Sequence, residues 1–304
     1  MEAVHALRRR STTGRGHALM VAGGLLLGTL GVFVERAGQD PLTTVWFRCA
    51  FGALALLGWG AVTGRLHELK LAPAGLAAAL GAGGLMIANW ALFFAAIERT
   101  SIGVATVVFH VQPLWLLLAG AWWRSEPLSP RRLGAALLAL AGLAAASGLF
   151  DGDAHSAAHD VRYWSGVAMC LGGSLAYAAV TLIAQGARTV GSFALAWWQC
   201  VVGALLLAWW PLLHGWPVFG AAWGWLAGLG VLHTGLAYVV LYAGIARLPA
   251  GRVALLQFVY PAAAVLIDAL AYGRALGGVQ ALGVLLMGVA LASLARGDAA
   301  RRSG

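Results

Sequence analysis

The chain has 304 residues, of which 61% are hydrophobic and only 10% are charged, and its mean hydropathy is +0.82. Ordinary globular chains contain about 45–50% apolar and about 25% charged residues. This composition therefore excludes a water-soluble globule and predicts a protein that crosses the lipid bilayer several times. A net charge of +9 would suggest a nucleic-acid partner for a soluble chain. Here it is explained by the charges that orient membrane helices, so no nucleic-acid partner is expected.

Continuous apolar runs predict that every crossing segment is an α-helix, because a helical span needs about 20 mostly apolar residues. The charge-free stretch 189–246 is too long for one span, and the turn between Pro211 and Pro217 divides it. The ten predicted helices cover residues 18–36, 43–62, 74–97, 103–123, 131–149, 164–185, 192–212, 219–246, 252–272 and 277–294. The predicted fold class is an all-α polytopic membrane protein with ten transmembrane helices.

Arginine and lysine residues are distributed unevenly over the predicted loops. With a cytoplasmic N-terminus, fifteen of them lie in segments on the inner side and four lie in outer loops. This is the positive-inside pattern, and it predicts that both termini are cytoplasmic and that the linker 150–163 is external. The Arg-rich, Gly- and Ala-rich composition is typical of a GC-rich bacterial genome, so the expected location is the bacterial inner membrane.

An internal repeat relates the two halves of the chain. Residues 46–52 (WFRCAFG) align at an offset of 151 with 197–203 (WWQCVVG), and 111–113 (VQP) align at an offset of 148 with 259–261 (VYP). Each half contains five predicted helices, an odd number, so the second copy must enter the membrane from the opposite side. This 5+5 inverted repeat is the architecture that supports alternating access.

The repeat also sets the expected domain boundaries. They are a cytoplasmic N-terminal arm at 1–17, repeat 1 at 18–149, an external linker at 150–163, repeat 2 at 164–294 and a cytoplasmic tail at 295–304. The two repeats are expected to share one buried interface and to act as a single domain.

Several short motifs follow one another along the first half. Pro41-Leu42 precedes Arg48 in the second helix, Pro113 lies midway along the fourth, and Glu126-Pro127-Leu128 with Gly134 opens the fifth. Together with the repeat, this order resembles the EamA-type branch of the drug/metabolite transporter superfamily. The resemblance implies a ten-helix carrier for small metabolites, often an exporter. The second half departs from the pattern, since Arg274 matches Glu126 and Gln199 matches Arg48.

Polar side chains inside predicted helices are costly in lipid, so they are expected to face a cavity or a partner helix. Arg48 would bind a substrate carboxylate through its planar guanidinium, with Trp46 offering an aromatic face to the solute. The alternatives are a structural pairing of Arg48 with a helix C-terminal carbonyl or an acidic side chain, or an Arg48 side chain that snorkels outward to the membrane surface. Asp268 and Glu126 are candidates for a coupling site or a charge pair, and a solvated position at the membrane surface is the alternative for Glu126.

Further polar and aromatic residues lie near mid-depth in two symmetry-related pairs of helices. Pro113 and Pro261 are predicted to break the fourth and ninth helices, which would form the gates and the site. The remaining predicted substrate-binding residues are Asn89, Trp90, His110, Gln112, His233, Tyr238, Gln257 and Tyr260. For each of them, hydrogen bonding between helices is an equally good interpretation.

The sequence contains no phosphate-binding loop, zinc-protease motif or nucleophile elbow, so an enzyme is not expected and no cofactor is predicted. Cys49, Cys170 and Cys200 are interpreted as buried hydrophobic residues. The linker carries His155, His159 and three aspartates, which would suit a loose metal site or a solvated loop; no metal is predicted. The predicted function is transport of a small organic metabolite, with a membrane-embedded enzyme for lipids or isoprenoids as the alternative. A homodimer stays open.

Overall fold

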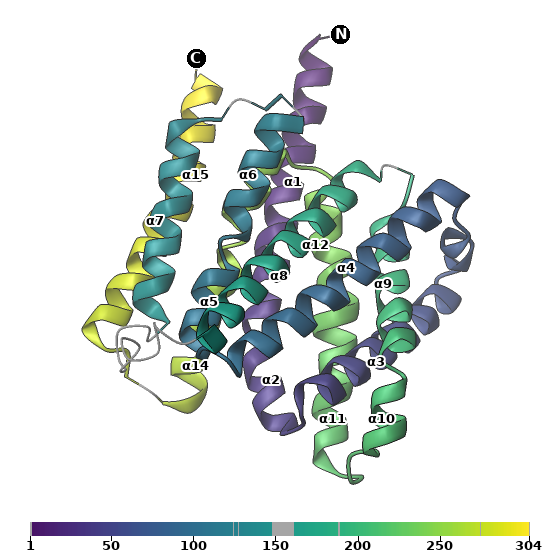
Figure 1. Cartoon of the computed structure of the whole chain (residues 1–304). Helices are drawn as coiled ribbons and strands as arrows, with labels where there is room; N and C mark the ends of the chain where they lie inside the picture. The colour runs from purple at the N-terminus through teal and green to yellow at the C-terminus, as the bar shows by residue number, and fades with distance from the viewer. Residues whose placement is uncertain are drawn as a thin grey trace. The chain divides into compact units, whose positions relative to one another are not determined.

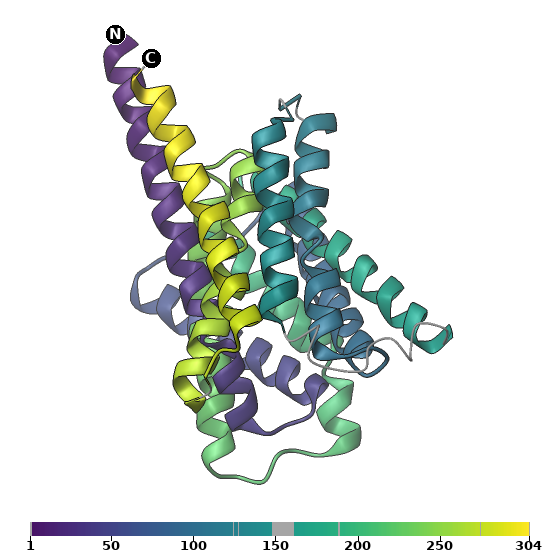
Figure 2. The same ribbon diagram turned by 90° about the vertical axis from the view of Figure 1, so that its left-hand side faces the viewer.

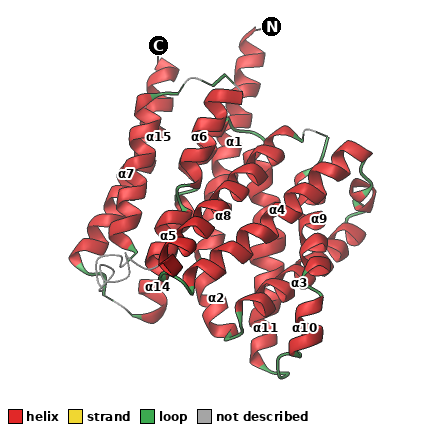
Figure 3. Ribbon diagram, viewed as in Figure 1, coloured by secondary structure: helices red, strands yellow, loops and turns green. Residues whose placement is uncertain are grey.

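A computed structural model describes residues 2–123, 125–126, 128–147, 161–187, 189–273 and 275–303. Within these ranges every regular element is a helix (Figure 3). Eight helices are long and apolar enough to cross a membrane, and Gly278–Ser293 forms a shorter apolar helix. With Pro130–Ala146, these helices occur at the ten predicted positions, so the all-α, polytopic fold class is confirmed.

The helices of the first half follow the predicted order, with two of them divided. They are α1 (Glu2–Gly28) with α2 (Leu30–Ala37), α3 (Pro41–Val62), the short 3-10 helix η1 (Leu66–Leu69), α4 (Pro73–Ile97), α5 (Ile102–Phe109) with α6 (Gln112–Trp123), and α7 (Pro130–Ala146). Local chemistry sets their starts. Asp40 accepts a hydrogen bond from the backbone N–H of Thr43, and Pro41 occupies the first turn of α3.

The second half repeats this plan with more interruptions. Its helices are α8 (Val161–Gly186), α9 (Ser192–Leu206) with α10 (Trp209–His214), α11 (Ala221–Gly228) continued by the π-helix η3 (Leu229–Leu236) and α12 (Ala237–Ile245), α13 (Ala250–Leu256) with α14 (Val259–Tyr272), and α15 (Gly278–Ser303). The predicted split between Pro211 and Pro217 is confirmed, because α10 ends at His214 and α11 begins at Ala221.

Two terminal helices are longer than the sequence predicts. Helix α1 begins at Glu2 instead of residue 18, and α15 continues to Ser303 instead of 294 (Figure 2). The apolar stretch marks where a helix can enter lipid, but Ala and Arg are good helix formers and prolong a helix beyond that stretch.

The chain divides into two compact units, and each contains parts of both repeats. Unit 1 comprises Met1–Ile87 and Ala179–Leu248, and unit 2 comprises Ala88–Ala178 and Pro249–Gly304. In unit 1, α3 packs against α9 and η3, and α1 packs against α12 (Figure 1). In unit 2, α6 packs against α13, and α7 lies alongside α15. Three of these contacts, α3 with α9, α6 with α13 and α7 with α15, join spans that correspond in the two repeats.

Candidate functional site

In unit 1, the paired helices α3 and α9 interlock through repeated residues. A methyl group added to Gly52 would lie 3.0 Å from Sγ of Cys200. At the corresponding position, a methyl group on Gly203 would overlap Sγ of Cys49. Each cysteine, fully buried, thus fills the space that the other helix's glycine leaves. A pseudo-two-fold relation between the repeats predicts this reciprocal pair of contacts.

Arg48 projects from this interlocked pair toward the π-helix. It is only 4% exposed, and its Nε donates a 2.8 Å hydrogen bond to Oγ1 of Thr234. The Thr234 hydroxyl donates in turn to the carbonyl of Leu229 over 3.0 Å. Both of these residues belong to η3, and π-helical segments are often found at functional sites. A hydroxyl group, which the sequence did not suggest, is therefore the partner of the Nε of Arg48.

His233 connects the same π-helix to the interruption between α1 and α2. Its Nε2 lies 2.7 Å from Oγ1 of Thr29, the single residue that separates these two helices. The imidazole also meets the ring of Phe33 edge-on, with centroids 4.5 Å apart. This supports the interpretation that His233 forms a hydrogen bond between helices, while a role in substrate binding stays a prediction.

The remaining predicted residues of unit 1 also have partners. The indole N–H of Trp46 donates to the carbonyl of Ala204 over 3.0 Å. The Tyr238 hydroxyl lies 3.9 Å from the sulfur of Met86. Gln199, the repeat counterpart of Arg48, is fully buried and accepts a hydrogen bond from the Tyr242 hydroxyl. Its Nε2 has no hydrogen-bond partner among the described residues.

Unit 2 contains the two broken helices that the sequence predicts. Helix α5 ends at Phe109 and α6 begins at Gln112, whereas α13 ends at Leu256 and α14 begins at Val259. Proline has no N–H, so Pro113 cannot serve the carbonyl of Phe109 and Pro261 cannot serve that of Gln257. These two carbonyls are related by the repeat offset of 148. Both halves are therefore interrupted next to corresponding prolines, and the two breaks agree within one residue.

The structure brings two of the predicted site residues together at these breaks. The rings of His110 and Tyr260 have centroids 6.0 Å apart, and Phe258 lies 6.4 Å from the same imidazole. His110 Nδ1 lies 2.7 Å from the carbonyl of Thr106. Gln112 is 2% exposed, and its Nε2 has no hydrogen-bond partner in the described part of the chain. A buried donor of this kind is a candidate for binding an acceptor atom of a solute.

Asn89 and Trp90 lie elsewhere in unit 2, where α4 meets α8. The Asn89 amide donates to the carbonyl of Gly173 over 2.8 Å, and Trp90 is 8% exposed. Close by in the sequence of α8, the Ser174 hydroxyl accepts a 2.9 Å hydrogen bond from the indole of Trp115. Asn89 thus joins two helices, which supports its structural interpretation.

The two predicted acidic candidates differ in their surroundings. Glu126 accepts hydrogen bonds from the backbone N–H groups of Ala250 and Gly251 at 3.1 and 3.3 Å. A purely solvated position for Glu126 is therefore wrong. Asp268 lies part-buried in α14. Its proposed role in coupling stays a prediction, as does the role of Gln257.

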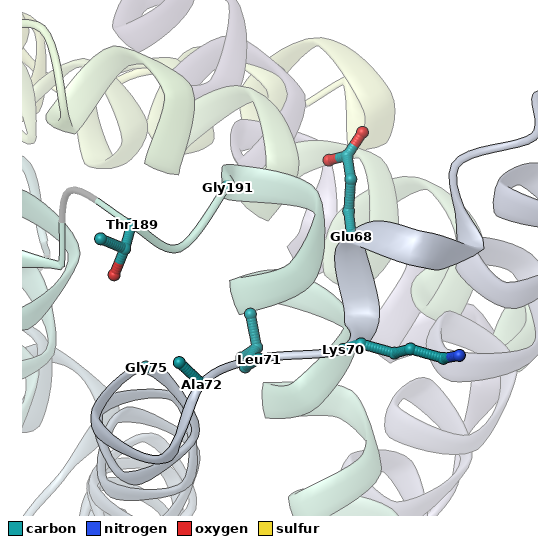
Figure 4. A pocket seen from close by; sticks show the side chains of 7 residues that line it. All are labelled: Glu68, Lys70, Leu71, Ala72, Gly75, Thr189 and Gly191. Atoms are coloured by element: carbon teal, nitrogen blue, oxygen red, sulfur yellow. The ribbon is translucent and has the colours of Figure 1, made fainter.

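A separate pocket of about 210 Å³ lies at the loops of unit 1 (Figure 4). None of the residues predicted from the sequence lines it; its walls are Glu68, Lys70, Leu71, Ala72, Gly75, Thr189 and Gly191. Arg65 donates two hydrogen bonds to the Glu68 carboxylate, at 2.5 and 3.0 Å. These bonds hold the pKa of the Glu68 carboxyl below its usual value.

The described residues contain no cluster of His, Cys, Asp and Glu side chains that could hold a metal ion. The linker residues Asp151, His155, His159 and Asp160, which suggested a loose metal site, lie outside the described residues, as does Arg274. Sequence reasoning did not find Thr29 and Thr234. A lone threonine in an apolar helix gives no pattern that would distinguish a hydrogen-bonding position from a packing position.

Duplicated halves, broken helices and buried polar side chains in a multi-pass helical chain are typical of membrane transport proteins. The chain belongs to the EamA-like transporter family, within the drug/metabolite transporter superfamily, because that family matches residues 14–148 and again 164–296. This membership overturns the alternative of a membrane-embedded enzyme.

Comparisons with individual proteins agree with the family. The chain is 25% identical over 286 residues to an uncharacterized transporter of Bacillus subtilis (strain 168), covering 91% of this chain and 89% of the relative. It is 26% identical over 285 residues to an uncharacterized transporter of Archaeoglobus fulgidus, covering 91% and 96%. A crystal structure with 20% identity superposes with a TM-score of 0.79 over 91% of this chain and 96% of that chain, which shows the fold.

Proposed function

We propose that this transporter moves a small organic solute that bears a carboxylate, such as an amino acid, by alternating access in the direction of export. The observation that carries this proposal is the pair of helix breaks beside corresponding prolines, Pro113 and Pro261, in the two repeats. Broken helices near mid-depth are where secondary transporters bind their substrates, because an interrupted helix exposes backbone groups that can bind polar atoms.

The residues beside the breaks support a polar site. His110 and Tyr260 approach each other from the two broken helices, and Gln112 offers an amide N–H group that has no partner in the described residues. A solute with carbonyl or carboxylate oxygens would supply the missing acceptor. Opening and closing on either side would expose Gln112 and Tyr260 alternately.

Arg48 supports a solute that carries negative charge. A guanidinium buried in a membrane helix is costly, and binding an anion is one way to compensate that cost. Its counterpart Gln199 keeps the hydrogen-bonding capacity but not the charge. Only one side of the pseudo-symmetric arrangement would therefore be cationic, which favours a carboxylate over a purely cationic drug.

The first experiment is a substrate screen in proteoliposomes, followed by two substitutions at Arg48. Arg48→Lys keeps the charge but loses the planar fork, so the affinity for a carboxylate should weaken, and Arg48→Gln should weaken it further. Both variants should still insert and stay monodisperse in detergent. Arg65→Gln is the matched control, because Arg65 pairs with Glu68 outside the membrane spans. Unchanged uptake by Arg48→Gln would overturn the anion-binding role.

Alternating access is tested separately from substrate charge. Cysteines placed at Gln112 and Tyr260, in a background that lacks Cys49, Cys170 and Cys200, should change their reactivity toward an impermeant thiol reagent when substrate is added. The reactivity of one should rise when that of the other falls. Cysteines that stay unreactive with and without substrate would contradict a cavity at the breaks.

The orientation is proposed from the charge of the loops, with both termini in the cytoplasm of a bacterial cell and linker 150–163 outside. A reporter that fluoresces only in the cytoplasm should be bright when fused after Gly304. The same reporter should be dark when the chain is truncated near Ser156. The opposite pattern would reverse the orientation.

A further inference from the structure

Helix α13, the first part of the second broken helix, receives no side-chain hydrogen bond from its own N-cap residue. Its N-cap residue is Pro249, which has no side-chain oxygen to accept a hydrogen bond from the first N–H groups. Those groups bond instead to the carboxylate of Glu126, with Ala250 donating to Oε1 at 3.1 Å and Gly251 to Oε2 at 3.3 Å. The cap therefore comes from outside α13, since Glu126 lies in the loop three residues after the end of α6.

The chain after α6 is folded so that Glu126 reaches α13. Ser125 adopts a left-handed backbone conformation with φ of 51°, which is unfavourable for a residue other than glycine and persists where surrounding contacts impose it. The backbone N–H of Glu126 then bonds to the carbonyl of Gly120 at 3.1 Å. A methyl group on Gly120 would lie 2.9 Å from Cβ of Ala250, so α6 and α13 are in close contact at this level.

In the first repeat, the N-terminus of the corresponding helix α5 is capped in a different way. Ser101 corresponds to Pro249 at the repeat offset of 148, and its Oγ accepts a 3.2 Å hydrogen bond from the N–H of Val104. Helix α5 is thus capped by its own N-cap residue. The position that corresponds to Glu126 is Arg274, and an arginine side chain has no acceptor. The carboxylate cap between helices therefore exists in one orientation of the repeat and has no equivalent side chain in the other.

We propose that the Glu126 carboxylate is a latch that keeps the cytoplasmic gate closed. This inference rests on the proposed alternating-access mechanism and its orientation, in which the C-terminal end of α6 and the beginning of α13 face the cytoplasm. These ends must separate when the inner side opens. The two charge-assisted hydrogen bonds exist only while they are together, so they stabilise the closed inner gate and leave the outer gate unaffected. The resting protein is biased toward a closed inner side.

The test measures access from the cytoplasm without any substrate. Leu117 is 4% exposed, and its Cδ2 would lie 3.4 Å from a methyl group on Gly251, so Leu117→Cys reports on this contact. The reporter is introduced with the three native cysteines replaced by alanine. Inside-out membrane vesicles are then treated with an impermeant maleimide. Because charge-assisted hydrogen bonds are among the stronger ones, Glu126→Ala should raise the labelling rate roughly tenfold, and Glu126→Gln, which keeps one acceptor, should raise it less.

Two controls separate a latch from a general loss of structure. Glu98→Ala removes an exposed carboxylate of unit 2 near the end of α4, and it should leave the labelling rate unchanged. Adding Pro249→Ser to Glu126→Ala gives α13 an N-cap of its own, like Ser101, but does not reconnect it to α6. The double variant should regain thermal stability while labelling stays fast.

Each outcome has one meaning for the latch. A labelling rate for Glu126→Ala within twofold of the parent, or a rate restored by Pro249→Ser, would overturn the proposal and leave Glu126 as a structural cap. If the latch fails while substrate still alters labelling at Gln112 and Tyr260, the carrier mechanism stands without it. If the labelling rates change as expected but no carboxylate is transported, the proposed substrate class is wrong and the proposed latch stands.

Discussion

The two units use the same duplicated sequence in opposite ways. In unit 1, α3 and α9 are each continuous where they pass each other, and they interlock through cysteines and glycines. In unit 2, the fourth and ninth spans, which correspond in the two repeats, are both broken, and α6 and α13 are joined by the Glu126 carboxylate at one end. Interlocked packing resists relative movement, because close-packed interiors tolerate little displacement. Hydrogen bonds at the ends of broken helices are easier to exchange. Duplication thus provides both a rigid seam and a hinged pair.

This comparison predicts where substitutions act. Changes at the seam of unit 1 should lower stability, whereas changes at the breaks of unit 2 should lower transport with little loss of stability.

The largest effect on stability is expected at Gly203. Its added methyl group in Gly203→Ala would overlap Cys49 and lie 2.7 Å from Cδ1 of Ile87, and overpacking of this kind costs about 1–3 kcal/mol. The melting temperature in detergent should fall clearly. Combining the change with Cys49→Ala, which removes the sulfur atom, should recover part of the loss. Gly58→Ala in α3, the helix that contains Cys49, meets open space and should be tolerated.

Repairing the breaks in unit 2 should have the contrasting effect. Pro113→Ala and Pro261→Ala restore an N–H group for the carbonyls of Phe109 and Gln257, so each broken helix can become continuous. Transport of the identified substrate should fall by about tenfold, which corresponds to about 1.4 kcal/mol in the barrier. The melting temperature should not fall. A parallel loss of stability and transport would remove the distinction between the units.

A smaller effect is expected where the π-helix meets Thr29. Thr29→Val keeps the shape but removes the hydrogen bond to His233, and such bonds between membrane helices contribute about 0.6 kcal/mol on average. A double-mutant cycle with His233→Phe, measured by thermal unfolding, should show this coupling. Additive losses would mean that the two residues act independently.

The smallest effect concerns pH at the loop of unit 1. Because Arg65 lowers the pKa of Glu68, the pair stabilises the fold fully above the usual carboxyl value of 4.5. The contribution is lost as the pH falls through the lower pKa of the folded state. For a partly exposed pair it should stay below about 1 kcal/mol. The contribution of the pair is measured by comparing how the melting temperatures of the parent and of Glu68→Gln change between pH 6 and pH 3. An equal change of melting temperature with pH in both proteins would contradict the prediction.

Much of the architecture was predictable from the sequence, because long apolar runs, prolines and the repeat are local patterns. The breaks at Pro113 and Pro261 follow from the missing N–H group of proline. The π-helix was not predictable, since Leu229–Leu236 reads as an ordinary apolar helix. This π-helical segment lies close to α3, since a methyl group on Gly230 would lie 3.0 Å from the carbonyl of Arg48.

The candidate site was less predictable than the fold. Arg48, His233 and Asn89 were recognisable as unusual residues, but their partners come from distant helices and leave no trace in local sequence. Glu126 shows the same limit. Its motif is recognisable, whereas its contact with α13 requires the left-handed turn at Ser125, which serine does not signal.

The reciprocal contact of Cys49 with Gly203 and of Cys200 with Gly52 has a consequence for how such a chain can evolve. In a half-length ancestor that assembled as an antiparallel pair of identical subunits, one cysteine and one glycine three residues later would create both contacts at once. Any substitution at either position would change both contacts. After fusion of the two copies, each contact depends on two separately encoded residues, so one half can change while the other preserves the seam. Arg48 and Gln199, one position before these cysteines, have already diverged in this way.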